Sequence, residues 1–213
     1  MAWEHFVALG TAFVLGIAHA FEVDHMTAVT AFVARRPTPK QAALFGVQWA
    51  VGHGASLLIF GIALWALHRT LPEAVAVSLE RLVGVALLGL GLWTLYGLRR
   101  EHQHRHAHDH GIRHAHGDSH GRGSLWMGLL HGVAGTAAFV GETLVAMSSR
   151  SLPLVLLFTL LFSLGVLVAM AGYAGALGSV LSWGERRFVG IARAAQVFTG
   201  LAACGVGIFW IVR

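Results

Sequence analysis

The stretch SLPLVLLFTLLFSLGVLVAMAGYAGALGSVLSWG, residues 151–184, decides the class of this protein. From Ser151 to Gly184 it contains no Lys, Arg, Asp or Glu. The hydrocarbon core of a bilayer is about 30 Å thick, and a helix needs about 20 apolar residues to cross it. Residues 41–68 and 194–212 form two further stretches without these charged residues. The sequence therefore predicts an all-α integral membrane protein.

The composition agrees with a chain that is embedded in lipid. Only 12% of the 213 residues are charged, whereas soluble globular domains carry about 25%. The net charge of +5 could indicate a nucleic-acid partner, but the Lys and Arg residues lie almost entirely between apolar stretches, as loop anchors do. We therefore expect membrane lipids, and no nucleic acid, as partners. The single cysteine, Cys204, excludes an intramolecular disulfide.

Charged and proline-containing turns divide the chain into six apolar stretches. The clearest turn, at residues 35–40, reads RRPTPK. Residues 99–123 form a longer polar loop between the third and fourth stretches. We predict a single transmembrane domain over 1–213 with six helices, at about 4–34, 41–67, 76–98, 124–147, 153–178 and 189–212.

Positive charge is divided unevenly between the two sides of these helices. Eleven of the 15 Lys and Arg residues fall in the first, third and fifth loops, and the other four fall on the opposite side. Cytoplasmic loops carry an excess of Lys and Arg, so the odd-numbered loops are expected in the cytoplasm. We predict a multi-pass protein of the cytoplasmic (inner) membrane with both termini outside.

The two halves of the chain resemble each other. The sequence GIAHA at 16–20 is echoed by GLLHG at 128–132. Gly84, Gly89 and Gly91 recur with the same spacing as Gly200, Gly205 and Gly207. Because three helices is an odd number, the halves would be inverted in the membrane, as in many secondary transporters. We predict a 3+3 inverted repeat, with repeat 1 at about 4–98 and repeat 2 at about 124–213; chance likeness between glycine-rich helices is the alternative.

The first predicted helix carries four ionisable side chains close together: His19, Glu22, Asp24 and His25. A charged group at the bilayer centre costs about 3 kcal/mol or more, so such groups face the protein interior and usually mark a substrate path. Imidazole and carboxylate groups together suit divalent ions such as Ni²⁺, Co²⁺, Cu²⁺ and Zn²⁺. A polar network between helices, or a proton relay without metal, is the alternative.

A regular helix cannot direct all of these side chains at one ion. At about 100° per residue, Asp24 lies about 140° from His19 around the helix axis, and His25 lies about 240° from it. We therefore expect the helix to be bulged or unwound here, or some of the groups to support the ligands rather than bind the metal.

Later helices add further polar residues to apolar surroundings. Gln48 and His53 lie in the second predicted helix, where a glycine on each side of His53 allows the close approach of a neighbour or an ion. His131 and Glu142 lie in the fourth. We predict that His53 contributes to the metal site, and that Glu22, Gln48, His131 and Glu142 line the pathway or support the ligands. For each of them a satisfied core residue is the alternative.

The loop at residues 99–123 holds eight of the chain's 14 histidines: His102, His104, His106, His108, His110, His114, His116 and His120. Tracts of this kind bind divalent transition metals loosely and cannot pack a core. We expect this loop to be an auxiliary metal-binding segment in the cytoplasm. A merely solvated loop is the alternative.

These motifs resemble the nickel/cobalt transporter (NiCoT) family, whose signature is H-x4-D-H in a membrane helix. His19, Asp24 and His25 match that signature, and the Gly-His and His-Gly elements at His53 and His131 follow in order. The resemblance implies that His19, Asp24 and His25 form the metal site and that His53 contributes to it. Classical members of the family have eight helices. With six predicted helices, this chain is instead similar to the short branch, the urease-associated nickel permeases.

The function expected from these features is secondary transport of Ni²⁺ or Co²⁺, with no enzymatic activity and no catalytic cofactor. The sequence has no G-x4-G-K-[ST] nucleotide-binding motif. A cytoplasmic metallochaperone is a further candidate partner. An intramembrane zinc-dependent hydrolase remains an alternative, although the sequence lacks H-E-x-x-H. A metal-binding partner subunit without flux of its own is another. The choice between nickel and cobalt and the direction of transport stay open.

Overall fold

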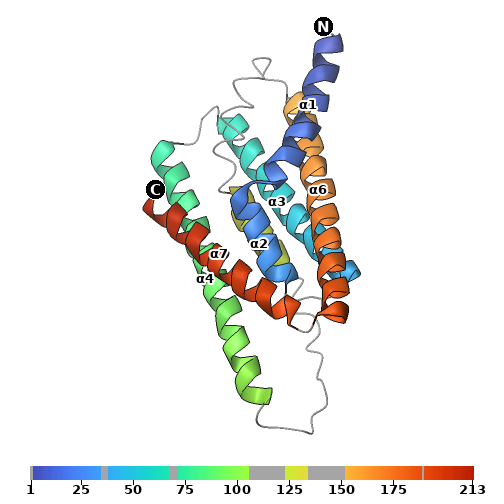
Figure 1. Cartoon of the computed structure of the whole chain (residues 1–213). Helices are drawn as coiled ribbons and strands as arrows, with labels where there is room; N and C mark the ends of the chain where they lie inside the picture. The colour runs from blue at the N-terminus through green and yellow to red at the C-terminus, as the bar shows by residue number, and fades with distance from the viewer. Residues whose placement is uncertain (1, 35–37, 68–71, 106–122, 134–151, 189) are drawn as a thin grey trace.

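A computed structural model describes residues 2–34, 38–67, 72–105, 123–133, 152–188 and 190–213. Within these ranges every regular element is a helix. The labelled helices are α1 (Ala2–Ala20), α2 (Val23–Val33), α3 (Pro39–Leu67), α4 (Glu73–Arg105), α6 (Leu152–Arg187) and α7 (Ile191–Val212) (Figure 1). Residues 123–133 form a further helical segment between α4 and α6.

Among the described residues, four helices are long and apolar enough to cross a membrane, and they confirm the prediction of an all-α membrane protein. The four stretches are Pro39–Ala63, Glu73–Leu98, Leu152–Arg187 and Arg193–Val212. Leu9–Ala20 is a shorter apolar helix. Large apolar side chains such as Ile59, Leu160 and Phe198 are exposed on the outside of the bundle, where hydrocarbon would surround them.

The first predicted helix, 4–34, is wrong as a continuous element. It ends at Ala20 and a second helix begins at Val23. The backbone amides of Phe21 and Glu22 donate hydrogen bonds to the carbonyls of Ala18 and His19, which tightens the last turn. Glu22 then adopts an extended backbone, with φ −64° and ψ 149°. The interruption is one of the outcomes expected from the angular spacing of the ionisable residues.

Other boundaries also differ from the prediction. α4 continues to Arg105, so the predicted loop at 99–123 is wrong for residues 99–105. α6 continues past 178 to Arg187. Both helices extend because a helix needs no apolar residues once it leaves the hydrocarbon, so charge marks the end of a membrane crossing and not of a helix. Of the predicted helix 124–147, residues 134–147 lie outside the described part of the chain.

Within the described part of the chain, the most extensive helix contacts are those of α3 with α6, α4 with α7, and α1 with α6. In Figure 1, α2 runs through the middle, between the crossed pair α4 and α7 and the group formed by α1, α3 and α6. The main core lies where α3 meets α6, around Trp49, Phe162 and Met170. Both ends of the chain lie toward one end of the bundle, and the end of α4 lies toward the other (Figure 1).

Glycines bring the backbones of these helices together. A Cβ atom on Gly165 of α6 would collide with the carbonyl oxygen of Phe13 in α1 and would lie 3.0 Å from the amide nitrogen of Ile17. Gly172, further along α6, has open space at the same position. Small residues at such crossings allow the close van der Waals packing that holds helices together in a membrane.

We predict that Gly165→Ala lowers the free energy of unfolding by about 1–3 kcal/mol, because the added methyl group meets fixed backbone atoms. The matched control, Gly172→Ala, should be neutral or stabilising by up to about 1 kcal/mol, since alanine favours the helix and meets nothing. Unfolding of the purified protein by SDS in mixed micelles measures both values. Equal effects of the two substitutions would contradict this account of the α1–α6 crossing.

Candidate metal site

The break between α1 and α2 brings two distant helix positions onto one site. His19 lies in the last turn of α1, and His25 lies in the first turn of α2. In one continuous helix their side chains would point in different directions, because the chain turns by about 240°, beyond one full turn, from His19 to His25. With the helix interrupted, the two imidazole rings stand edge to face with their centroids 4.5 Å apart.

α3 supplies a third imidazole. The ring of His53 lies 5.3 Å from that of His19 and 5.2 Å from that of His25, measured between centroids. One nitrogen atom from each of the three histidines lies within 4.8 Å of the corresponding atoms of the other two. We call this group the three-imidazole cluster. His25 and His53 are fully enclosed, with 1% and 0% of their surfaces exposed.

The hydrogen bonds of the cluster leave ligand atoms free. The Nδ1 of His19 lies 2.8 Å from Glu22 Oε1, and the Nδ1 of His25 lies 2.9 Å from Asp24 Oδ1. A carboxylate accepts, so each Nδ1 carries the proton and each Nε2 keeps a lone pair. This carboxylate–histidine arrangement is the one that orients metal-binding imidazoles.

Buried nitrogen atoms without partners point to a missing ligand. Within the described residues, the Nε2 of His25 and both ring nitrogens of His53 are buried and have no hydrogen-bond partner. Native proteins satisfy most buried polar atoms, so an unpartnered group calls for an explanation such as an ion. A divalent metal bound by the three imidazoles would occupy a lone pair on each ring.

The two carboxylates lie at the outer side of the cluster. Glu22, Asp24 and His25 also bring three potential ligand atoms within 4.8 Å of one another. Asp24 is 13% exposed at its side chain and Glu22 is 56% exposed, so accessibility falls from Glu22 through Asp24 to His25. The structure thus places Asp24 against the Nδ1 of His25, where it can support that ligand or bind an ion through its second oxygen.

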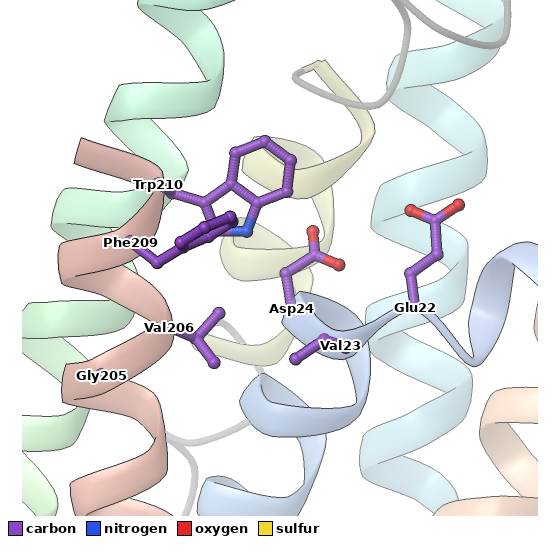
Figure 2. Close-up of a pocket in the computed structure, with 7 residues that line it drawn as sticks. All are labelled: Glu22, Val23, Asp24, Gly205, Val206, Phe209 and Trp210. Atoms are coloured by element: carbon purple, nitrogen blue, oxygen red, sulfur yellow. The ribbon is translucent and has the colours of Figure 1, made fainter. Parts of the chain in front are cut away.

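A cavity of about 460 Å³ opens beside these carboxylates. Its lining comes from the start of α2 and the end of α7: Glu22, Val23, Asp24, Gly205, Val206, Phe209 and Trp210 (Figure 2). Figure 2 shows the carboxylate of Asp24 between the indole of Trp210 and the side chain of Glu22. The apolar α7 wall of the cavity faces the carboxylates at the start of α2, so the cavity reaches Asp24.

The other residues singled out from the sequence fall into four groups. His131 is buried next to the cluster, with its ring 5.4 Å from that of His25. Gln48 lies half-buried on α3. Glu142 and six of the eight loop histidines, from His106 to His120, lie outside the described residues. His102 and His104 fall in the last turns of α4.

Sequence reasoning missed two aromatic residues that shape the site. Trp49 stacks on His53, with centroids 5.1 Å apart and an interplanar angle of 12°, and meets His25 edge to face at 5.0 Å. Phe162 of α6 lies 5.3 Å from His19. The spacing of four between Trp49 and His53 placed them on one helix face and was the available signal. These rings shield the imidazoles from lipid and water.

Two known proteins are similar to this chain over most of its length. The chain is 32% identical over 208 residues to the urease accessory protein UreH of Bacillus sp. (strain TB-90), and the match covers 95% of this chain and 90% of that protein. The chain belongs to the nickel/cobalt transporter family. It is also 27% identical over 167 residues to a protein of Methanocaldococcus jannaschii named "Putative nickel/cobalt efflux system MJ1092", over 77% of this chain and 72% of that protein. No protein-family model and no solved structure matches the chain.

Membership of the nickel/cobalt transporter family confirms the resemblance found in the sequence. The relatives are named as an accessory protein and as a transport system, and not as enzymes. The expectation of a protein that is not an enzyme agrees with those names.

We predict that Asp24→Asn weakens Co²⁺ binding about ten-fold and Asp24→Ala about 100-fold, within the range typical of groups that support metal ligands. Asparagine keeps an oxygen for the His25 Nδ1 proton but loses the charge, whereas alanine loses both. Titration of the purified protein with Co²⁺, followed by its visible absorption, measures the affinity. The loop histidines should be changed to Ser in every sample so that only the intramembrane site binds.

Glu73→Gln is the matched control, because it removes an exposed carboxylate from the start of α4. Its affinity should equal that of the parent protein. Unchanged affinity in both Asp24 variants would show that the hydrogen bond to His25 has no part in metal binding.

Proposed function

We propose that this protein is a secondary transporter that carries Ni²⁺ or Co²⁺ across the cytoplasmic membrane through the three-imidazole cluster. The observation that carries the proposal is the convergence of His19, His25 and His53 inside an apolar helix bundle, where His25 and His53 have buried and unpartnered nitrogens. Imidazole is a good ligand for transition-metal ions of this kind. The names of the two relatives, one a urease accessory protein and one a putative nickel/cobalt efflux system, support the same cargo.

The arrangement fits transport because it replaces water around the ion in steps. Exposed Glu22 and less exposed Asp24 line the cavity and would attract a hydrated cation. The enclosed imidazoles would then substitute for its water ligands. A cation without ligands is very costly inside a bilayer, so a neutral, multidentate site lowers the barrier at the midplane. The sequence carries no nucleotide-binding motif, and we assign the driving force to an ion gradient.

We further propose six membrane crossings in a 3+3 inverted repeat, and matching glycine contacts support it. A Cβ on Gly16 of α1 would meet the carbonyl oxygen of Phe162 in α6, and one on Gly128 would meet that of Trp49 in α3. Gly128 corresponds to Gly16 in the alignment of the halves, and Phe162 corresponds to Trp49 within one position of the same register. The same contact is therefore made twice, with the roles of the two halves exchanged.

At each of these two crossings, the partner helix also contributes a glycine, and this second contact is repeated as well. A Cβ on Gly165 would meet the carbonyl oxygen of Phe13, and one on Gly52 would meet that of Leu125. Gly165 corresponds to Gly52, and Leu125 to Phe13, again within one position of that register. A two-fold relation between the halves requires this exchange, whereas two unrelated glycine-rich helices would have no reason to keep one register.

The α4–α7 pair supplies an independent match. A Cβ on Gly84 would lie 2.8 Å from the carbonyl oxygen of Gly207, and one on Gly91 would lie 2.6 Å from that of Gly200. Gly84 and Gly91 correspond to Gly200 and Gly207 in the repeat. These glycines belong to the two triplets that were aligned from the sequence, and here they meet across one crossing.

The proposed orientation places both termini outside and the His-rich loop in the cytoplasm. It rests on the eleven-to-four division of Lys and Arg. On that side of the membrane the loop would exchange metal with a cytoplasmic metallochaperone. No catalytic cofactor is part of the proposal, since the metal is the cargo.

We predict that His25→Ala and His53→Ala each lower Co²⁺ flux at least about 100-fold, because each removes an enclosed ligand of the cargo. Proteoliposomes with a trapped metal-sensitive fluorophore and an imposed pH gradient measure the flux. Thr94→Val is the control, since Thr94 is buried in α4 and donates to the carbonyl of Leu90 in its own helix. Parent-like flux in either histidine variant would remove that residue from the pathway. Metal binding without flux in the parent would favour a partner subunit that only binds metal.

We predict that changing all eight loop histidines to Ser alters metal delivery but preserves selective flux. A His-rich tract offers many weak, interchangeable ligands. Free histidine has a pKa of about 6.5, and only the neutral form binds metal, so the loop should release metal as the pH falls toward about 6. Flux measured on either side of this pKa in both proteins checks the effect.

The side of the membrane on which the loop lies is tested with Ser119→Cys, which places a thiol in the loop. The background is Cys204→Ser, which removes the chain's single natural cysteine. An impermeant thiol reagent should reach the new thiol only from the cytoplasm. Labelling from outside intact cells would overturn the orientation, and a correctly inserted loop variant without any flux would make the loop part of the obligatory path.

A further inference from the structure

His131 has the features of a metal ligand but lies outside the three-imidazole cluster. Its side chain is buried, with 1% of its surface exposed. Its Nδ1 donates to the carbonyl oxygen of Met127 at 3.0 Å, which leaves the lone pair on Nε2. Within the described part of the chain this Nε2 is buried and has no partner. Burying such an atom is costly unless a ligand satisfies it in some state of the protein.

His131 occupies the repeat position of His19. The spacing from Gly128 to His131 equals the spacing from Gly16 to His19, and both glycines make the same kind of helix crossing. The surroundings of the two imidazoles also correspond. His19 lies 5.3 Å from the ring of Phe162, and His131 lies 5.7 Å from the ring of Trp49. Phe162 and Trp49 are themselves repeat partners.

His25 connects the two. Its ring contacts that of His19 at 4.5 Å and that of His131 at 5.4 Å. It also contacts His53 at 5.2 Å. The cluster in this conformation contains His19, and His131 is not one of its members. Glu22, which accepts the hydrogen bond from the Nδ1 of His19, lines the cavity beside the cluster.

We propose that His131 replaces His19 as the third imidazole when the site opens to the opposite side of the membrane. His25 and His53 would bind the ion in both states. This inference rests on the proposed transport function and on the inverted repeat. We call the segments that carry His19 and His131 the two arms of the site, and the repeat relates these arms to opposite faces of the membrane. The cargo is a divalent ion of the nickel or cobalt kind.

The exchange of His19 for His131 forms one metal–nitrogen bond for each one that it breaks. The bond from the metal to Nε2 of His131 forms as the bond to Nε2 of His19 breaks, and both imidazoles stay neutral. Each Nδ1 keeps its proton, which stays hydrogen-bonded to Glu22 in one arm and to the Met127 carbonyl in the other. The ion keeps at least two imidazole ligands throughout and is never left bare in the bundle, which would be very costly.

Single and double variants test this exchange by equilibrium binding. With the loop histidines changed to Ser, Co²⁺ titrations are compared for the parent, His19→Ala, His131→Ala and the double variant. Because either arm can complete the site, each single variant should weaken binding by less than about ten-fold, with about a two-fold loss if the states are equally populated. The double variant has no third imidazole and should bind more than about 100-fold more weakly than the parent.

A histidine that only packs the core gives the opposite pattern. His131→Ala would then bind like the parent, and His19→Ala would be as weak as the double variant, which would overturn the proposal. His131→Gln guards against misfolding, because its amide can still donate to the Met127 carbonyl while it is a poor ligand. It should behave as His131→Ala does. A parent-like affinity of the double variant that combines His19→Gln with His131→Gln would also overturn the proposal.

Flux measurements separate this inference from the proposed function. In proteoliposomes, His131→Ala should lose at least about ten-fold in Co²⁺ flux although it still binds the ion. Parent-like flux in that variant would overturn the exchange. If the parent itself carries no flux while the non-additive binding pattern is found, the transport function fails and His131 stands as an alternative ligand.

Discussion

The interruption between α1 and α2 is the constraint on which the rest of the site depends. In a bilayer every backbone polar group needs a partner, so a helix can break only where protein surrounds it. Here the amides of Phe21 and Glu22 bond back to Ala18 and His19, and α3, α6 and α7 pack around α2. The break turns His25 toward His19 and leaves Glu22 and Asp24 at the cavity. Without it the two imidazoles of α1 and α2 could not share an ion.

Close helix crossings give this site its rigidity. Glycines in α1, α3, α6 and residues 123–133 seat one backbone on another, so that the helices approach more closely than larger side chains would allow. Gly128 packs against the backbone of Trp49 and His53, so the contact that joins α3 to residues 123–133 also positions the imidazole from α3. Packing and ligand geometry are therefore set by the same residues. The proposed transport of metal ions through an apolar bundle would need such coupling, because the ligands would have to be held apart from lipid and still exchange an ion.

The carboxylates and the imidazoles of the site differ in how deeply they are buried. The exposed carboxylate of Glu22 and the enclosed nitrogens of His53 mark the two ends of one gradient of accessibility. In the proposed pathway, charge at the mouth would attract a cation, whereas neutral nitrogen at depth would bind it without leaving an unpaired anion in the protein when the ion departs. This division accounts for the presence of both ligand types in one short segment of chain, where either type alone would serve a simple binding site.

The sequence alone determined the class of the protein, the positions of most membrane helices, the side chains that are candidate metal ligands, and the family. Those features follow from local properties: apolar length, charge at helix ends and side-chain chemistry. It also showed that one regular helix could not aim His19 and His25 together, because angular spacing is a property of a single helix. Only the tertiary structure decided where that helix breaks, which nitrogen of His19 and of His25 is left for a ligand, and that Trp49 and Phe162 enclose the rings. These depend on how separate helices pack, and the periodicity of one helix carries no information about the residues that face it from another.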